Sequence, residues 1–413
     1  MKPSIISAER VLPITRPLLK NGAMLISPGK ILEIGTRAEL KKKYPEAEER
    51  HHELLMPGLV NGHTHIELSG LPLLAPGKSF TDWLIQIIEQ KRALDPARIE
   101  REARLALENA LALGITSLGD IVSLPVIFGA HKQGKLFSTV FFELTGMRDE
   151  DVKNRVSLAK SVLGEHNFRL GNNQLGISLH APYSASLALF EAARKTASER
   201  GLALCTHLAE SRDETEFIMS GQGAIAARLY PLVGWSQLKP APNLVSPARY
   251  LAPAIDQNLT LVHCVEISDD DLEIISRSRA VVHCPRSNLH LSGKLAPVPK
   301  MLRSGVKVAL GTDSPASAGD SNLWNEMKKV LELRREYPGG EIAPSEILQM
   351  VTINGARAIF REHELGSIEP GKIANLLALK ISSRSENLEE LAGSIIASGP
   401  EQIGAVYLAG SRV

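Results

Sequence analysis

Residues 55–65 read Leu-Met-Pro-Gly-Leu-Val-Asn-Gly-His-Thr-His, and this stretch joins an apolar segment to a pair of histidines. Residues 55–61 have the apolar content and the turn-forming boundary of a short buried strand. His63 and His65 follow it, and their two-residue spacing in an extended chain points both imidazoles to one side. A histidine pair of this kind is more often structural than ligating, so the rest of the chain decides its meaning.

Seven further apolar or β-branched runs come later in the chain, and amphipathic stretches separate them. The eight predicted strands are residues 55–61, 115–121, 137–144, 175–180, 203–208, 260–265, 280–284 and 306–312. One intervening helix is predicted over residues 95–113, where Gly114 ends it. Strands that alternate with helices form parallel sheets, and eight of them favour a closed (β/α)8 barrel, the TIM-like α/β fold, over an open sheet.

Two segments lie outside the predicted barrel, which spans residues 55–365. Residues 1–54 and 366–413 both contain short alternating strands and turn pairs such as Asn21-Gly22 and Pro370-Gly371. We expect these two ends of the chain to fold together as one small composite β-sandwich domain, because the termini of a domain often lie close together.

Composition narrows the class of protein. The 413 residues carry a formal net charge of +1, with 44% hydrophobic and 23% charged residues. A near-neutral chain gives no electrostatic reason to expect nucleic acid or an anionic membrane as a partner, so we expect a small-molecule substrate. Oligomerisation stays open, and a homo-oligomer is compatible with this composition.

The start of the chain does not resemble a signal peptide. Glu9, Arg10 and two prolines interrupt residues 1–15, and no window reaches the length of a membrane span, so we expect a cytoplasmic protein. The three cysteines, Cys205, Cys264 and Cys284, lie in apolar segments, and we expect buried thiols rather than disulfides.

Polar residues mark the ends of several predicted strands. His207 ends the fifth strand, His263 ends the sixth and Asp313 ends the eighth. The C-terminal ends of barrel strands form one face, where barrel enzymes build their sites, so these side chains and the histidine pair converge. Each alone could be a core histidine or a capping aspartate, but together they favour a single divalent ion: zinc first, with iron or manganese as alternatives.

The sequence resembles the amidohydrolase superfamily, specifically its deaminase and chlorohydrolase branch, over nearly the whole chain. The motifs that carry the resemblance are residues 56–65, 207–210, 263–264, 285–288, 309–314, 354–356 and 366–372. One departure is Asn375, where the family usually has an aspartate. His180, rather than a lysine, stands at the end of the fourth strand, which implies a mononuclear site rather than the lysine-bridged pair of ions of other members.

The resemblance implies roles for the residues at the strand ends. The metal ligands would be His63, His65, His207 and Asp313. Glu210 would be the general acid and base, although a carboxylate in the first turn of a helix is also favourable for stability alone. His263 would steady the attacking oxygen, and Asp313 would also accept a proton.

Three residues are implied contacts of the substrate, each with a structural alternative. Trp83 resembles a residue that stacks on nucleosides, or it is a buried residue of a helix face. His180 resembles a substrate-contacting histidine, or it has a core role. Arg148 could pair with a substrate carboxylate, or it is a solvated loop residue. In deaminases of methylthioadenosine and S-adenosylhomocysteine, a glutamate that binds ribose usually stands at the position of Thr81.

The resemblance therefore implies hydrolytic removal of the 6-amino group from a purine nucleoside-like compound. Aminodeoxyfutalosine ranks first as the substrate, followed by methylthioadenosine and S-adenosylhomocysteine. The alternatives are a guanine or cytosine deaminase and a triazine-type chlorohydrolase. A barrel scaffold without catalysis would lack the ligands, which are all present, and the cytidine-deaminase zinc site requires a cysteine pair that this sequence does not contain.

Overall fold

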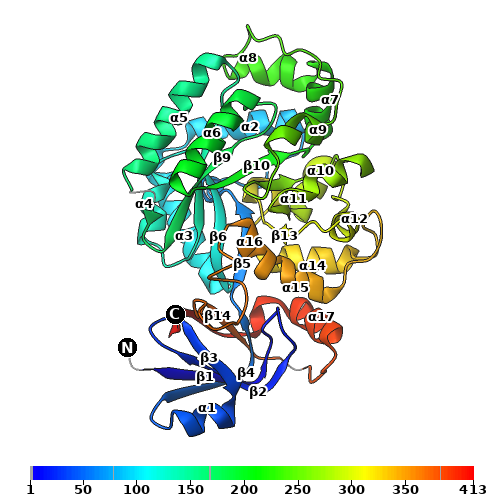
Figure 1. Cartoon of the computed structure of the whole chain (residues 1–413). Coiled ribbons are helices and arrows are strands. Elements are labelled where there is room, and N and C mark those ends of the chain that lie inside the picture. Colours follow the sequence, from blue (N-terminus) through cyan, green and yellow to red (C-terminus); the bar gives the residue numbers. More distant parts are fainter. Residues whose placement is uncertain (1–2, 78, 167–168, 382) are drawn as a thin grey trace.

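The computed structural model describes residues 3–77, 79–166, 169–381 and 383–413. Its strands form two separate sheets, one of nine strands and one of seven. Figure 1 shows the larger sheet in the upper body with helices around it, and the smaller sheet below. Both ends of the chain lie at the smaller sheet.

The larger sheet contains eight parallel strands in sequence order. These strands are β5 (Leu59–Thr64), β6 (Ile115–Val122), β7 (Thr139–Leu144), β9 (Asn173–Leu179), β10 (Ala203–Leu208), β11 (Thr260–His263), β12 (Ala280–His283) and β13 (Val308–Leu310). The short strand β8 (Arg169–Leu170) pairs antiparallel with β9. A parallel bridge between Thr64 and Asp313 joins the first strand to the segment that follows the last one. The predicted TIM-like barrel is therefore confirmed.

The first predicted strand is wrong at its boundaries, because Gly58 divides it. Residues up to Pro57 belong to β4 (Glu48–Pro57) of the smaller sheet, whereas β5 begins at Leu59 and contains His63 and Thr64. A side chain at residue 58 would meet Thr116 at 2.3 Å, so the backbone can pass this close to β6 only at a glycine.

Helices fill the connections of the barrel. They are α2 (Phe80–Ala93), α3 (Pro96–Ala112), α4 (Ile127–Gln133), α5 (Asp149–Gly164), α6 (Leu187–Arg200), α7 (Arg212–Ser220), α8 (Tyr230–Leu232), α9 (Pro247–Leu251), α10 (Leu272–Ser276), α11 (Pro285–Ser292), α12 (Val298–Arg303), α13 (Pro315–Ala318), α14 (Leu323–Leu333), α15 (Pro344–Met350) and α16 (Ile353–Ala358). Single turns are η1 (Ile66–Leu68), η3 (Ala252–Ala254) and η4 (Asp269–Asp271), and η2 (Ile225–Leu229) is a π-helical turn.

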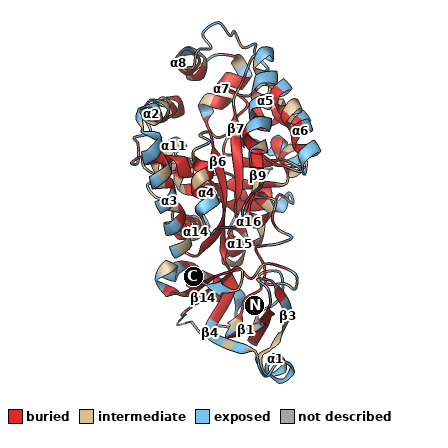
Figure 2. Cartoon of the chain, turned by 90° about the vertical axis from the view of Figure 1, so that its left-hand side faces the viewer, coloured by how far each residue is buried: buried red, intermediate tan, exposed pale blue. Residues whose placement is uncertain are grey.

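Helix α3 shows how the sequence sets these elements. The side chain of Asp95 caps its first turn by accepting a hydrogen bond from the Arg98 backbone, and Gly114 follows its end with φ of +75°. The predicted helix is confirmed. Figure 2 shows the barrel strands β6, β7 and β9 as buried and the helices around them as exposed on their outer sides, which is the pattern of amphipathic helices packed on a core.

The smaller sheet is built from both ends of the chain. Its strands run in the order β16 (Ser411–Arg412), β15 (Ile403–Leu408), β14 (Leu376–Leu379), β4, β1 (Ser4–Val11), β2 (Leu19–Ile26) and β3 (Ile31–Thr36). The helices α1 (Arg37–Lys43) and α17 (Leu388–Ser398) and the turn η5 (Gly399–Gln402) complete these two segments. The antiparallel pairing of β14 with β4 joins the two ends. This confirms a separate sheet of composite origin, whereas the domain boundaries at residues 54 and 366 stay a prediction.

Asn21-Gly22 does not form the predicted turn, because both residues lie inside β2. Asn21 instead has φ of +48°, and any side chain at Gly22 would meet Leu19 and Val11 at 2.8 Å. Tight packing between the strands therefore accounts for the glycine.

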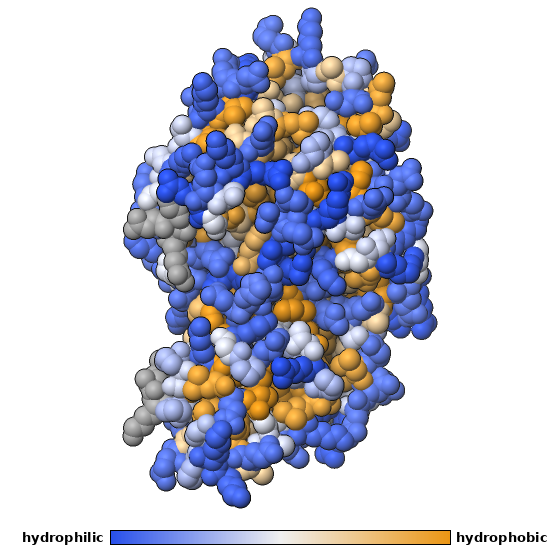
Figure 3. Space-filling model, viewed as in Figure 1, coloured by the Kyte–Doolittle hydropathy of each residue, from blue (hydrophilic) through white to orange (hydrophobic). Residues whose placement is uncertain are grey.

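The hydropathy of the surface and the burial of the cysteine thiols are those of a globular protein. Figure 3 shows a largely hydrophilic face on which hydrophobic residues are interspersed, with several over the smaller sheet. No helix in the described ranges is both long and apolar enough to cross a bilayer. Cys205, Cys264 and Cys284 are buried free thiols, as the sequence predicts.

Candidate metal centre and active site

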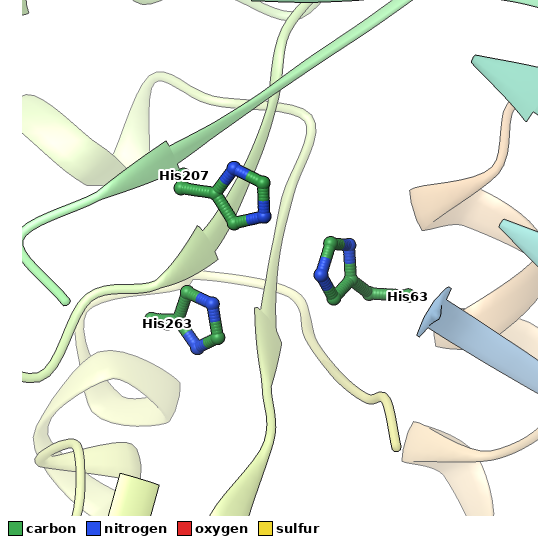
Figure 4. Close-up of side chains that lie close together, drawn as sticks. All are labelled: His63, His207 and His263. Carbon is green, nitrogen blue, oxygen red and sulfur yellow. The ribbon is translucent and has the colours of Figure 1, made fainter. Parts of the chain in front are cut away.

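Four histidines and an aspartate gather at the C-terminal mouth of the barrel. Figure 4 shows the rings of His63, His207 and His263 turned toward a shared space from different strands, and one nitrogen of each lies within 4.8 Å of the others. His65 and Asp313 form a second such group with His63. The Oδ1 atom of Asp313 lies 3.8 Å from Nε2 of His63 and 3.6 Å from Nε2 of His65.

The closure of the barrel fixes the first two histidines against the aspartate. The carbonyl of His63 accepts hydrogen bonds from the backbone nitrogens of Thr312 at 3.0 Å and Asp313 at 3.2 Å, and the nitrogen of His65 donates to the Asp313 carbonyl at 3.4 Å. The seam that closes the barrel therefore runs through the cluster. Residues from opposite ends of the barrel sequence are held at one place by backbone contacts.

Strained backbone occurs where the strands end. His263, Cys264 and Asp313 have φ of +73°, +48° and +54°, and Ala209, after β10, has φ of +50°. Non-glycine residues in this region cost about 1–3 kcal/mol each when the surroundings enforce them, and they concentrate at functional sites. These positive φ values therefore lie at or just beyond the ends of β10, β11 and β13, where His207, His263 and Asp313 stand.

The hydrogen bonds of His207 define which nitrogen is available. Its Nδ1 lies 2.6 Å from the carbonyl oxygen of His180. A carbonyl can only accept, so Nδ1 carries the hydrogen and Nε2 keeps its lone pair. The Nε2 atom of His63 is buried without a hydrogen-bond partner among the described residues. Such an unsatisfied atom is costly unless something outside the protein meets it.

His263 faces the second carboxylate of the site. The amide nitrogen of Asn288 lies 3.0 Å from its Nδ1, which then accepts, and the hydrogen is left on Nε2. That Nε2 lies 3.4 Å from Oε1 of Glu210. His263 is therefore oriented to donate a hydrogen bond into the space beside Glu210.

Hydroxyl groups hold one oxygen of Asp313 and leave the other free. Ser287 and Ser317 donate to Oδ2 at 2.6 and 3.0 Å. Burial opposes ionisation of Asp313, but His65, His263 and the Ser287 hydroxyl outweigh it and hold its pKa below the ordinary value. Asp313 is thus a carboxylate whose Oδ1 points at His63 and His65.

Burial also keeps the rings neutral. It is the largest cause that lowers the pKa of His63, and the neighbouring histidines lower it further. Burial likewise lowers the pKa of His65 and His263 to about 3. Neutral imidazoles and one carboxylate are the donor set that zinc takes at about 2.0–2.2 Å, so the residues present fit such an ion.

Glu210 is a buried acid on a rigid support. Burial, followed by the charges of Asp313 and Glu214, raises its pKa well above the ordinary value. The carboxylate of Glu214 accepts hydrogen bonds from the backbone nitrogens of Ala209 and Glu210, both at 3.0 Å. This contact fixes the turn that presents Glu210.

Glu214 itself gives a testable pH effect. Burial raises its pKa from 4.5 to about 7, against the two backbone hydrogen bonds that lower it. An acid whose folded pKa is raised stabilises the fold fully below the unfolded pKa, and this contribution is lost as pH rises through the folded pKa. We therefore expect the unfolding free energy of wild type, relative to Glu214→Gln, to fall by about 3 kcal/mol between pH 4.5 and 7.5. Urea unfolding at both pH values measures it, with the exposed Glu216→Gln as control. An unchanged difference would contradict the prediction.

Four members of the cluster, His65, His207, His263 and Asp313, line a cavity of about 350 Å³, a size that suits a small organic ligand. Ten apolar or aromatic residues also line it: Leu68, Phe80, Trp83, Leu84, Ile87, Ile88, Tyr183, Leu229, Val233 and Trp235. Trp83 lies on α2, and its indole nitrogen donates to the carbonyl of Ala316 at 3.1 Å. His180 also lines the cavity, and its Nδ1 lies 2.6 Å from Oγ of Ser184. Trp83 and His180 therefore both lie where a substrate could contact them.

The structure does not bring Arg148 to this cavity. It lies at the start of α5, where its guanidinium donates to the carbonyl of Gly234 at 3.2 Å and to Glu150 at 3.4 Å. Arg155, two helical turns further along α5, lines the cavity instead. Thr81 is turned away as well, because its hydroxyl donates to Asp213 at 2.6 Å.

Sequence reasoning missed four charged residues of the cavity: Glu67, Lys91, Glu143 and Arg155. Lys91 forms an ion pair with Glu67, which also accepts hydrogen bonds from the backbone of Ser123 and Leu124 at 2.9 and 3.1 Å. Glu143 did carry a signal, because it is a lone charge in the otherwise apolar strand β7. The other three stand in ordinary amphipathic or loop sequence.

A (β/α)8 barrel with such a histidine and aspartate cluster at its mouth defines a hydrolase of the amidohydrolase type. The Amidohydrolase family is matched over residues 54–402, and the chain belongs to this family. It is 28% identical over 378 residues to a 5-methylthioadenosine/S-adenosylhomocysteine deaminase of Moorella thermoacetica, which covers 89% of this chain and 83% of that protein. It is 31% identical over 352 residues to an aminodeoxyfutalosine deaminase of Deinococcus radiodurans. That match covers 81% of this chain and 82% of the relative.

Among solved structures, Helicobacter pylori aminofutalosine deaminase in complex with methylthio-coformycin has a TM-score of 0.85 at 23% identity. The match covers 99% of this chain and 100% of that one, and it shows the shared fold. The family match and the sequence relatives show that the chain is an enzyme. It is a hydrolase of carbon–nitrogen bonds, of the deaminase class.

Proposed function

We propose that this enzyme hydrolytically removes the 6-amino group of a purine nucleoside-like substrate with one divalent ion, zinc first among the candidates. One observation carries the proposal. The buried histidine and aspartate cluster shares one cavity with a raised-pKa acid, Glu210, and with apolar aromatic walls. The relatives named above as deaminases of adenosine-like nucleosides agree with it.

His63, His65, His207 and Asp313 would hold the ion. The unpartnered Nε2 of His63 and the free Oδ1 of Asp313 support this set. When bound, the ion supplies a water nucleophile that is acidic enough to react near neutral pH. His207 has only the lone pair of Nε2 to give, because its Nδ1 hydrogen is committed to the His180 carbonyl. That supports a single ion.

The residues of this chain would move the protons. Glu210, protonated because its pKa is raised, would donate to a ring nitrogen of the purine and make the carbon beside it more electrophilic. Asp313 would take a proton from the attacking water, and the Nε2 hydrogen of His263 would stabilise the developing oxyanion. Glu210, left as a carboxylate, would receive the proton that Asp313 took from water and pass it to the amine, which leaves as ammonia. As the carbonyl forms, the remaining proton of the added water would return Glu210 to its protonated state, and water supplies the oxygen of the product.

The substrate ranking rests on the outer part of the cavity. Arg155 lines it and has no hydrogen-bond or ion-pair partner among the described residues. A guanidinium pairs a carboxylate bidentately, so Arg155, rather than Arg148, is the residue we propose for a benzoate-like group. Aminodeoxyfutalosine therefore stays first, ahead of methylthioadenosine and S-adenosylhomocysteine. Guanine, cytosine or triazine compounds are the alternative substrates.

Comparative kinetics test the substrate. We expect ammonia release with a higher kcat/KM for 6-aminopurine nucleosides than for guanine, cytosine or triazines. Arg155→Ala should lower kcat/KM for aminodeoxyfutalosine by about 10- to 100-fold, as expected for a charged hydrogen bond, and change methylthioadenosine turnover by less than about threefold. Arg148→Ala is the matched control and should leave kcat/KM for both substrates unchanged. A faster reaction with guanine or cytosine would overturn the substrate class, whereas a preference for methylthioadenosine would overturn only the ranking.

A further inference from the structure

One carboxylate of the cavity has no role in the chemistry above. Glu143 lies near the C-terminal end of β7 and lines the cavity. Its Oε1 is buried without a hydrogen-bond partner, and no hydrogen bond or ion pair of the described residues engages either oxygen. Phe141, two residues earlier on the same side of β7, packs against Ala203 and Cys205 inside the barrel. Glu143 is therefore the next inward residue toward the mouth.

The neighbours of Glu143 make their hydrogen bonds to other groups. One of its oxygens lies within 4.8 Å of nitrogens of His180 and His207. The Nδ1 of His207 donates to a carbonyl, and Nδ1 of His180 contacts Ser184. The nearby cation, Lys91, donates to Glu67 and Ser123.

A second metal ion does not explain this carboxylate. An ion between Glu143, His180 and His207 would need a second lone pair from His207. A neutral imidazole has only one, and on His207 it is on Nε2, which faces His63. The remaining explanation is that Glu143 meets a group of the substrate.

The chemistry of a nucleoside limits which group that is. The unpartnered Oε1 of Glu143 is a hydrogen-bond acceptor, and a buried acceptor left unpaired costs free energy. The ring nitrogens of adenine are acceptors, and its amino group must lie by Glu210, which follows β10, two strands away from β7. The donors that remain are the hydroxyls of the sugar.

We propose that Glu143 is a specificity-determining residue that accepts a hydrogen bond from a sugar hydroxyl and so selects ribonucleosides over analogues that lack these hydroxyls. The proposal rests on the proposed function, because it assumes a nucleoside substrate. A site built to pair a hydroxyl rejects the analogue without it, since the buried acceptor is then left unpaired.

The test compares the nucleoside that the wild-type enzyme deaminates fastest with its 2′,3′-dideoxy analogue. We expect wild type to prefer the hydroxylated compound by at least about tenfold in kcat/KM. Glu143→Ala should lower kcat/KM for that compound by about 10- to 100-fold and bring the ratio to within about threefold of one. Glu143→Gln keeps an uncharged acceptor and should lose less. The exposed Glu150→Gln is the control and should retain the wild-type ratio.

Measurements of metal content and thermal unfolding distinguish a role of Glu143 in substrate specificity from a purely structural role. Both should match wild type in the Glu143 variants. An equal loss of kcat/KM for both nucleosides, or a loss of bound metal, would mean that Glu143 acts through His207. An unchanged ratio of the two kcat/KM values would mean that Glu143 does not contact the sugar. Each of these results overturns the inference while the proposed function stands. If the metal-loaded wild-type enzyme deaminates none of the 6-aminopurine nucleosides named above, the proposed function fails, and this inference fails with it.

Discussion

Alanine at His207 or Asp313 is expected to abolish deamination and to lower bound metal, while the barrel stays folded. Each change removes a donor from the candidate ion site, and without the ion no water nucleophile forms near neutral pH. We expect kcat/KM to fall at least about 10⁴-fold, a modest part of the 10⁶–10¹⁷-fold by which enzymes accelerate reactions. Metal stoichiometry by elemental analysis and ammonia release from the same preparation measure both effects.

The fold must be checked separately, because both residues are buried. Far-ultraviolet circular dichroism should match wild type, and the exposed His363→Ala should keep metal and activity. Prolonged chelation of wild type should reproduce the loss, and added zinc should restore it. Full activity in metal-free His207→Ala protein would refute the metal-dependent assignment.

Glu210→Gln is expected to keep the metal and lose the chemical step. The amide preserves the shape of the side chain but cannot shuttle a proton, and general acid–base catalysis contributes about 10²–10⁴-fold. The loss should appear in kcat rather than KM, because ground-state binding is retained. Steady-state kinetics with metal analysis measure it, and Glu216→Gln, an exposed change on α7, is the matched control. A fall in kcat of less than about tenfold would leave no general acid role for Glu210.

The core of the fold could be predicted because local patterns repeat along the chain. Eight apolar segments separated by amphipathic stretches each bury a strand, and every predicted strand overlaps an observed one. The error at residues 55–57 arose because Leu55, Met56 and Pro57 are as apolar as the barrel strand that follows. Periodicity reports burial, but it cannot tell which of two sheets a strand joins.

The candidate site could be predicted where the chain itself directs the side chain. His63 and His65 leave one strand on the same side, and the strand ends carrying His207, His263 and Asp313 must meet at one face of a barrel. Their gathering needs only the topology. Their roles as ligands, acid and base remain proposals.

What the sequence by itself determined is the barrel and the residues at its mouth, because strand order and strand ends follow from the pattern along the chain. Only the tertiary structure decided which side chains face the cavity. Arg155 lines it and Arg148 does not, although both belong to the same segment, because the packing of α5 decides which turn faces inward. Glu143 stands without a partner for a similar reason. The side chains near it are Lys91 on α2, His207 on β10 and His180 after β9, and the hydrogen bonds of these side chains are made to other groups. Such competition among distant groups for hydrogen bonds exists only once the chain is folded, and no spacing in the sequence encodes it.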